Sequence, residues 1–360
     1  MKLFKCQSCD QVVYFENIMC EKCGHRLGFL PEITDMASIE PTESGLFEPV
    51  IAAGGRYRYC ANASFGVCNW LVSGESSDAF CRACRHNRLI PDVGILANLR
   101  AWQQTEFAKH RLFYSLIRLR LPLENRQDAL GSGLAFEFPA SNGLGSKILT
   151  GHDNGVITIA LEEADDVERE TQRSAMHEPY RTLLGHFRHE IGHYYWDRLV
   201  RDGDKLEAAR AVFGDDRADY SEALKAYYAN GAGPDWQHNF VTPYATAHPW
   251  EDFAETWAHY LHIVDTVEMA GAFGLQVRPA LDTTGDMRAV VDFDPYSAPH
   301  IDRIVETWPP LSLALNSLNR TMGQADVYPF VLSGGAIRKL GFIHNLIRAN
   351  QPSSIKCNQK

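Results

Sequence analysis

The sequence predicts an α+β fold, with a short β region followed by a mainly helical remainder, preceded by a small cysteine-rich module. Eight of the nine cysteines lie in the first 84 residues. Three segments rich in β-branched and aromatic residues follow between residues 134 and 161. Farther along the chain, apolar residues recur at helical spacing. We therefore divide the 360 residues into a module at 1–90 and a domain at 91–360.

The cysteines of the module have the spacing of metal sites rather than disulfides. They form two sets, Cys6, Cys9, Cys20 and Cys23 in the first and Cys60, Cys68, Cys81 and Cys84 in the second. The first set is made of two Cys-x-x-Cys pairs around a short strand pair expected at residues 12–15, and the second contains one wider pair. Four thiolates complete the coordination of a zinc ion. The sequence therefore predicts a zinc-ribbon module with two structural zinc ions in a reducing compartment, the cytoplasm.

The remaining elements follow in chain order. A helix is expected over residues 93–121, where Leu99, Trp102 and Leu112 recur among polar residues before Pro122. Strands are expected at residues 134–138, 147–150 and 156–161, the last two joined by a turn at Asn154-Gly155. Further helices are expected at about residues 179–200, 217–229, 250–269, 301–321 and 333–349.

The strongest chemical signal is His189-Glu190-Ile191-Gly192-His193, within the helix expected at residues 179–200. Residues four apart share a helix face, so both imidazoles can bind one metal ion. Glu190 is offset by about 100° around the helix, where a general base beside the activated water belongs. The motif indicates a zinc hydrolase of the zincin type, and the plainer alternative is two solvated helix histidines.

A second helix can complete the site. Glu251 and Glu255 follow Pro249 and lie one turn apart on the same helix face. One carboxylate can bind the zinc, while the other can form a hydrogen bond to one of the zinc ligands without contacting the metal itself. Two histidines and one glutamate leave the fourth coordination position open, as a catalytic zinc requires. The spacing alone leaves open which glutamate is the ligand.

These two segments resemble the gluzincin metallopeptidases, in particular the catalytic domain of anthrax lethal factor. There a His-Glu-Phe-Gly-His helix is paired with a Tyr and a following Glu-x-Phe-Ala-Glu run; here Tyr244 precedes Glu251-Asp252-Phe253-Ala254-Glu255. The resemblance implies a zincin-like fold, with Glu251 as the third zinc ligand and Glu255 as a supporting carboxylate. It also implies that Tyr244 donates a hydrogen bond to the oxyanion of the tetrahedral intermediate.

The whole chain is also similar to bacterial zinc-binding metallopeptidases with an N-terminal zinc ribbon, through residues 151–158, 164–166, 319–323 and 328–332. Together the resemblances imply a zinc-dependent peptidase in which Glu190 takes a proton from a zinc-activated water. The strand expected at residues 156–161 is the candidate for binding a peptide as an added strand.

Charge limits the choice of partners. The formal net charge of -10 gives no general attraction to nucleic acid or anionic membranes. No signal peptide is evident, and no segment is long and apolar enough to span a bilayer. A small basic patch is expected at Arg82, Arg85 and Arg88, and the acidic residues of the module favour a protein partner over nucleic acid there.

A function from another class remains open. The chain could be a zinc-ribbon regulator that binds protein or nucleic acid and retains a non-catalytic zincin scaffold. The complete ligand set favours the enzyme, because a scaffold has no need of the base Glu190. The neighbouring histidines His186, His259 and His262 are expected to be packing or surface residues.

Overall fold

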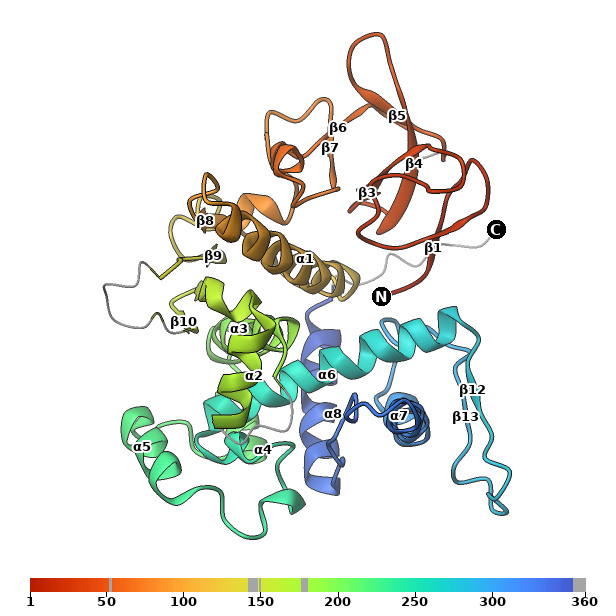
Figure 1. The fold of residues 1–360 in the computed structure, drawn as a ribbon. Helices are drawn as coiled ribbons and strands as arrows, with labels where there is room; N and C mark the ends of the chain where they lie inside the picture. Colours follow the sequence, from red (N-terminus) through yellow and green to blue (C-terminus); the bar gives the residue numbers. More distant parts are fainter. Residues whose placement is uncertain (52–53, 142–147, 149, 176–180, 352–360) are drawn as a thin grey trace, which may run out of the picture. The chain divides into compact units, whose positions relative to one another are not determined.

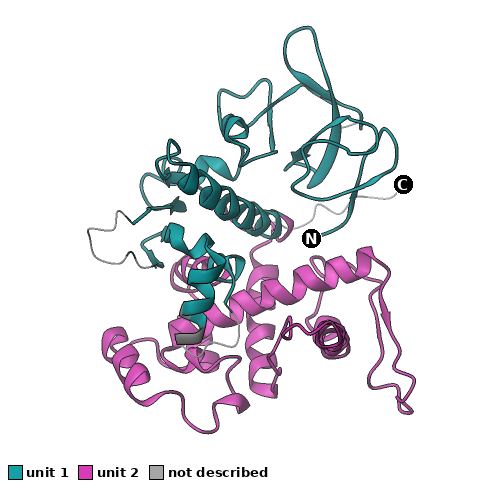
Figure 2. Ribbon diagram, in the orientation of Figure 1, with its two compact units in different colours: residues 1–117, 123–187 teal, residues 118–122, 188–360 magenta. Residues whose placement is uncertain are grey.

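The computed structural model describes residues 1–51, 54–141, 148, 150–175 and 181–351. The chain forms two compact units (Figure 2). Unit 1 contains residues 1–117 and 123–187, and unit 2 contains residues 118–122 and 188–360. The division at residue 90 stays a prediction.

Unit 1 begins with two β structures (Figure 1). Strands β1 (Phe4–Lys5) and β2 (Val12–Val13) pair antiparallel within the first cysteine set. An antiparallel five-stranded sheet follows in the order β3 (Arg26–Leu30), β4 (Asp35–Pro41), β5 (Phe47–Pro49), β6 (Tyr57–Tyr59) and β7 (Leu71–Ser73). Its core contains Leu30, Ala37, Ile39 and Leu71. This sheet was not predicted from the sequence.

A second sheet in unit 1 has the strand order β10 (Gly151–Asp153), β11 (Val156–Thr158), β9 (Ala135–Glu137) and β8 (Asn87–Leu89). Strand β9 runs parallel to β8 and β11, and β10 runs antiparallel to β11. The predicted turn joins β10 to β11, with φ of 46° at Asn154 and 82° at Gly155, as a tight hairpin requires. Of the strand predicted at 147–150, residues 147 and 149 lie outside the described residues, and 148 and 150 belong to no strand.

Unit 1 also contains α-helices and short 3-10 helices. Helix α1 (Leu96–Arg118) buries Trp102, Leu112 and Leu116, as its apolar spacing predicts. Short 3-10 helices lie at η1 (Ala61–Phe65), η2 (Cys84–His86) and η3 (Leu161–Ala164). Helix α2 (Asp166–Ala175) was not predicted.

Unit 2 is mainly helical. Helix α3 (Leu183–Tyr195) starts in unit 1, enters unit 2 at Arg188 and continues as the π-helical turn η4 (Trp196–Arg201). The other elements are α4 (Leu206–Phe213), α5 (Tyr220–Asn230), η5 (Trp236–His238), η6 (Tyr244–Thr246), α6 (Pro249–Ala272), β12 (Gln276–Val277), β13 (Ala289–Val290), α7 (Asp302–Thr321) and α8 (Gly334–Ala349). The helices predicted at 217–229, 250–269, 301–321 and 333–349 are thus confirmed, whereas α4 was not predicted. None of the described helices combines the length and the apolar character that a membrane span requires.

Helix α6 is the centre of unit 2 and contacts α4, α7 and α8. It also packs closely against α3. A Cβ atom built on Gly192 would lie 2.9 Å from the Ala254 Cα and 3.2 Å from the Trp257 Cβ. The glycine of the His-Glu motif therefore lets the two helix backbones approach each other where the predicted ligands lie.

Candidate metal centres

Three predicted ligands converge between α3 and α6. The Nε2 atoms of His189 and His193 are 3.2 Å apart, and the Glu251 Oε2 lies 3.0 Å from the first and 3.5 Å from the second. Tetrahedral zinc with bonds of about 2.0–2.1 Å to nitrogen and oxygen separates its ligand atoms by roughly 3.3–3.4 Å. The Glu251 Oε2 is buried and forms no hydrogen bond with the described residues. The three atoms therefore fit a zinc ion.

Tyr220, at the start of α5, holds the other oxygen of Glu251. Its hydroxyl donates a hydrogen bond to the Glu251 Oε1 at 2.5 Å. Asp219 caps the helix by accepting from the Glu222 backbone N–H, which fixes the first turn that carries Tyr220. Tyr220 was not predicted from the sequence, because it precedes Glu251 by 31 residues and belongs to no recognisable motif.

Glu255 contacts the opposite side of the His189 ring. Its Oε1 lies 2.7 Å from the His189 Nδ1, and its Oε2 accepts a hydrogen bond of 2.7 Å from the Thr242 hydroxyl. A carboxylate on Nδ1 fixes the orientation of an imidazole whose Nε2 binds a metal. Of the two glutamates, Glu251 therefore faces both Nε2 atoms and Glu255 does not.

Thr242 links this carboxylate to the segment that carries Tyr244. Its hydroxyl also accepts a hydrogen bond of 3.1 Å from the Ala245 backbone N–H, within the turn that begins η6. The Tyr244 ring lies 6.1 Å from the His189 ring, centroid to centroid. The structure thus brings Tyr244 to the site, as a neighbour of one histidine.

The electrostatics of the site follow from burial and pairing. Burial opposes ionisation of Glu251, but the two imidazoles outweigh it and hold the pKa of this carboxyl well below its ordinary value. Burial, together with the charge of Glu251, raises the pKa of Tyr220 and of Tyr244 far above the ordinary value. Both phenols therefore stay protonated and can donate hydrogen bonds.

Glu190 is a buried carboxylate that takes no part in the hydrogen bonds and ion pairs of Glu251 and Glu255. Its side chain is 8% exposed, and it forms no hydrogen bond or ion pair with the residues that the structure describes. A buried carboxylate is normally paired. Glu190 is therefore available to a water molecule or a substrate beside His189.

The neighbouring histidines serve other contacts. His186 pairs with Glu163 within unit 1, where their Nδ1 and Oε2 atoms are 3.1 Å apart. The His259 Nδ1 lies 2.6 Å from the Tyr328 hydroxyl, and the His262 Nδ1 lies 2.5 Å from Arg188. These contacts agree with the packing roles that we expected.

Both cysteine sets gather in unit 1. In the first set the Sγ atoms are 3.5 Å apart for Cys6 and Cys23 and 3.6 Å apart for Cys9 and Cys20. In the second set Cys68 and Cys81 are 3.7 Å apart. Zinc–sulfur bonds of about 2.3 Å place the ligand atoms of a tetrahedron roughly 3.8 Å apart. All eight cysteines are free of disulfides, and each set of four fits a zinc ion.

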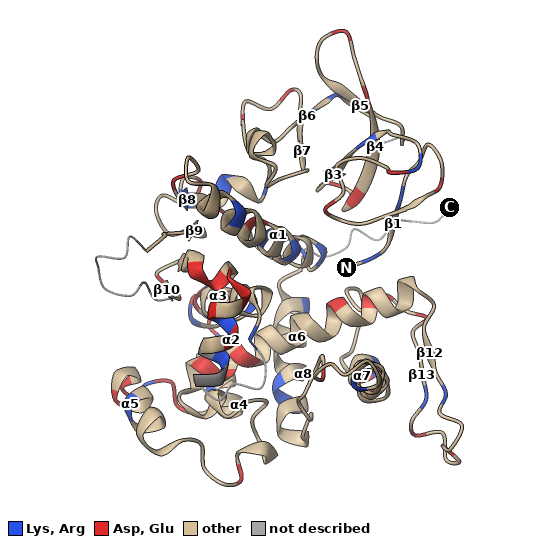
Figure 3. Cartoon of the chain, viewed as in Figure 1, with Lys and Arg blue, Asp and Glu red and all other residues tan. Residues whose placement is uncertain are grey.

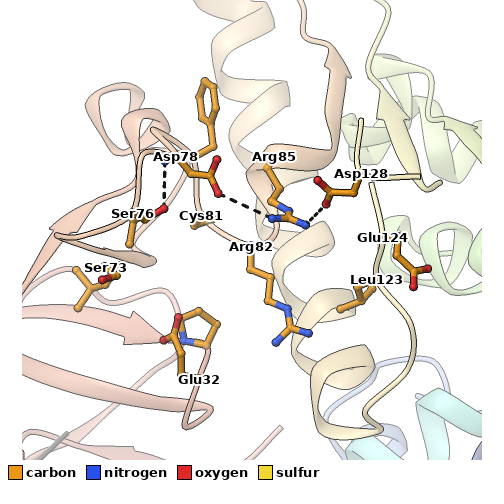
Figure 4. Close-up of a pocket in the computed structure, with 14 residues that line it drawn as sticks. Glu32, Ser73, Ser76, Asp78, Cys81, Arg82, Arg85, Leu123, Glu124 and Asp128 are labelled. Carbon is orange, nitrogen blue, oxygen red and sulfur yellow. Dashed lines mark hydrogen bonds and ion pairs between the residues drawn. The ribbon is translucent and has the colours of Figure 1, made fainter. Parts of the chain in front are cut away.

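The basic patch expected beside the second set is largely neutralised. Arg85 lies between the carboxylates of Asp78 and Asp128, at the edge of a cavity of about 360 Å³ (Figure 4). Arg88 pairs with Glu137 at 2.6 Å. Elsewhere in the chain, the Asp, Glu, Lys and Arg residues of helix α6 are all acidic and those of α8 all basic, whereas α2 carries both kinds (Figure 3). Ion pairs with neighbouring carboxylates therefore offset the charge of Arg85 and Arg88, and a partner for this surface stays a prediction.

These features define a metal-binding protein in which two cysteine sites precede a His-His-Glu site. Residues 98–346 match the family described as "Putative zinc-binding metallo-peptidase", and residues 3–95 match a zinc-ribbon domain. The chain therefore belongs to this zinc-binding metallopeptidase family and carries an N-terminal zinc ribbon.

Relatives share almost the full length. The "Uncharacterized protein Mb2598c" of Mycobacterium bovis and the "Uncharacterized protein Rv2568c" of Mycobacterium tuberculosis are each 42% identical over 348 residues, which cover 96% of this chain and 95% of theirs. No solved structure is significantly similar.

Proposed function

We propose that this protein is a zinc-dependent peptidase with a gluzincin-type active site and a zincin-like fold in its second domain. One observation supports the proposal above all. The two imidazole Nε2 atoms and the Glu251 Oε2 lie 3.0–3.5 Å from one another, with Glu190 adjacent to His189 in the same helix. A zinc ion bound there would polarise the peptide carbonyl and lower the pKa of a water molecule.

Side chains around the metal would carry out proton transfer, stabilisation of the oxyanion and orientation of the ligands. Glu190 would accept the proton of the attacking water and pass it to the leaving amine. Tyr244, which stays protonated, would donate a hydrogen bond to the oxyanion. Glu255 would orient His189 through Nδ1, and Tyr220 would hold the Glu251 Oε1 away from the metal.

The two cysteine sites would be structural, giving one catalytic and two structural zinc ions. A closed four-thiolate site has no open position for a substrate, so its metal contributes to folding. Cysteines used in this way favour a reducing compartment, the cytoplasm. We further propose that the substrate is a peptide or protein and that the zinc ribbon binds a protein partner.

The test compares the native protein with Glu190→Gln and with Glu222→Gln, a control at an exposed glutamate that pairs with Lys225. Each is assayed for zinc content and for cleavage of a diverse peptide library, with the cut sites mapped. We expect about three zinc ions per chain in all forms, and a loss of cleavage of at least about 100-fold in Glu190→Gln alone. Zinc-loaded native protein that cleaves no better than Glu190→Gln would contradict the proposal and favour the non-catalytic regulator.

A further inference from the structure

The two cysteine sites differ in their access to water. All four cysteines of the second set are buried, with exposed fractions between 2% and 6%. In the first set Cys23 is exposed and Cys9 is half-buried. A zinc ion with four thiolates carries a double negative charge, and water cannot solvate it in a buried site. The protein must therefore supply hydrogen-bond donors to the second set.

Backbone N–H groups donate hydrogen bonds to three of the four sulfurs. The Sγ atoms of Cys60, Cys68 and Cys81 accept hydrogen bonds of 3.3–3.4 Å from the backbone N–H groups of Cys81, Trp70 and Cys84, in that order. Within the described part of the chain, the Cys84 sulfur accepts no backbone hydrogen bond. It needs a donor from a side chain.

His110, on α1, lies where that donor is needed. Its Nε2 is 3.7 Å from the Cys84 Sγ and 3.3 Å from the Cys68 Sγ. Its Nδ1 donates to the Glu106 carbonyl at 2.6 Å, and its ring packs on Trp70 at 5.0 Å between centroids. Because Nε2 also faces acceptors, the two sulfurs, both ring nitrogens must carry a proton when His110 donates to a thiolate, so the ring acts as an imidazolium. These contacts fix the orientation of the ring, with its Nε2 toward two of the four sulfurs.

The neighbouring carboxylate does not make this a second metal site. The Glu106 Oε2 lies 3.7 Å from the Cys84 Sγ, so Cys84, Glu106 and His110 could in principle share an ion. Lys109, however, is fully buried and donates to the Glu106 Oε1 at 2.8 Å, and Asn87 donates to the same oxygen at 2.7 Å. The ammonium group already neutralises the carboxylate and would repel a second cation.

We propose that His110 is the side-chain hydrogen-bond donor of the second zinc site, acting on the Cys68 and Cys84 thiolates, and that α1 is thereby part of this site. A charge-assisted hydrogen bond offsets part of the thiolate charge. The cysteines belong to the zinc-ribbon match and His110 to the metallopeptidase match. Through His110, the first helix of the metallopeptidase segment therefore contacts the metal ligands of the ribbon.

The first test follows zinc loss from each set separately in the full-length protein. A chelator is added, and alkylation of each cysteine is timed by mass spectrometry in the native protein, His110→Ala, His110→Gln and the control His344→Ala. His344 is a buried histidine of unit 2 that bonds Tyr260. We expect the second set of His110→Ala to react about 10- to 100-fold faster, as for other residues that support metal ligands. His110→Gln keeps an N–H donor and should react within a few-fold of the native rate.

A second measurement separates a donor from a ligand. The cobalt(II)-substituted native protein and His110→Gln should show the same sulfur-ligand absorption, because both hold the metal with four thiolates. If the native spectrum shows that a nitrogen ligand binds the cobalt, and this signal disappears in His110→Gln, the proposal is overturned. Zinc loss from the second set of His110→Ala at the native rate would also overturn it. If His110→Ala does not fold, the rate and spectrum of His110→Gln decide the question.

Discussion

Tyr220 and Thr242 each donate a hydrogen bond to one of the two carboxylates beside the histidines. Neither residue belongs to a sequence motif. Their effect depends on which carboxylate oxygen they hold. By occupying the Glu251 Oε1, Tyr220 leaves only Oε2 to face the imidazoles, which favours binding of the metal through one oxygen and keeps a coordination position open.

Tyr220→Phe should therefore weaken zinc binding at this site. The variant keeps the ring and removes only the hydroxyl, so the Glu251 Oε1 loses its donor and the carboxylate is free to turn. Residues that support metal ligands typically contribute about 10- to 100-fold to metal affinity or activity. We expect a loss in this range, measured by chelator competition and by peptide cleavage.

The matched control is Tyr228→Phe, an exposed tyrosine on the same helix. It should retain native zinc affinity. Equal affinity of Tyr220→Phe and the native protein would show that the hydrogen bond does not support the ligand.

The sequence could predict those site residues whose geometry a single helix determines. His189, Glu190 and His193 are related by helical spacing, and Glu251 and Glu255 by one turn. The structure brings all five together, although their chemical roles stay predictions. Tyr220, Thr242 and His110 come from other elements, and only tertiary packing places them at a site.

At the scale of elements, the crossing of α3 and α6 determines the distance between the histidines and Glu251. Gly192 permits this crossing, because a Cβ at this position would lie 2.9 Å from the Ala254 backbone. Gly192→Ala should force the helices apart and lower the free energy of unfolding by about 1–3 kcal/mol. Zinc affinity of the His-His-Glu site should fall with it.

Denaturant unfolding and zinc competition would measure both effects. Gly341→Ala in α8 is the control, since its new Cβ would lie at an ordinary 3.7 Å from Ile301. Alanine is the better helix former, so this control should be neutral or slightly stabilising. If Gly192→Ala matches the control in unfolding free energy and in zinc affinity, close packing at this position is not required.

The packing of α6 against α8 includes a buried ion pair. Lys339 is 2.6 Å from the Asp252 Oδ2, and these side chains are 6% and 0% exposed. Lys339 also donates to the Asn239 carbonyl at 2.6 Å and lies over the Phe240 ring. Lys339→Met would leave Asp252 buried without its cation, which should cost about 3–5 kcal/mol of unfolding free energy.

The double variant Asp252→Asn with Lys339→Met tests the cause of that loss. It removes the uncompensated charge and should recover part of the stability in urea unfolding. If it is no more stable than Lys339→Met alone, lost packing rather than the buried, uncompensated charge of Asp252 explains the effect.

At the scale of the whole molecule, the helical part was easier to predict than the ribbon. The long helices α1, α6, α7 and α8 carry sustained apolar periodicity, which specifies both their existence and their buried face. The strands from β3 to β7 are short, and five of seven residues in β4 are buried or half-buried in one run, without the alternation that marks a half-exposed strand. Such a pattern does not distinguish a strand from a loop between metal ligands.

The stability of unit 1 in acid should depend on Glu163. This residue lies in η3, is 4% exposed, and pairs with Arg181 at 2.7 Å and with His186 at 3.1 Å. Burial raises the pKa of Glu163, but the hydrogen bond and charge of His186 and the charge of Arg181 outweigh it and lower the pKa from 4.5 to about 2. The ionised form is therefore favoured by folding.

The sign of the pH dependence follows from this lowered pKa. The stabilisation is fully present above the unfolded pKa of 4.5 and is lost as the pH falls toward about 2. Glu163→Gln should be less stable than the native protein at neutral pH, and the difference should shrink between pH 5 and about 2. Because metal release in acid affects both proteins, the difference between their unfolding free energies isolates Glu163. Glu170→Gln, at an exposed glutamate paired with Arg173, should differ little from the native protein at any pH. A stability difference for Glu163→Gln that stays constant across this pH range would show that its carboxyl group does not change ionisation on folding.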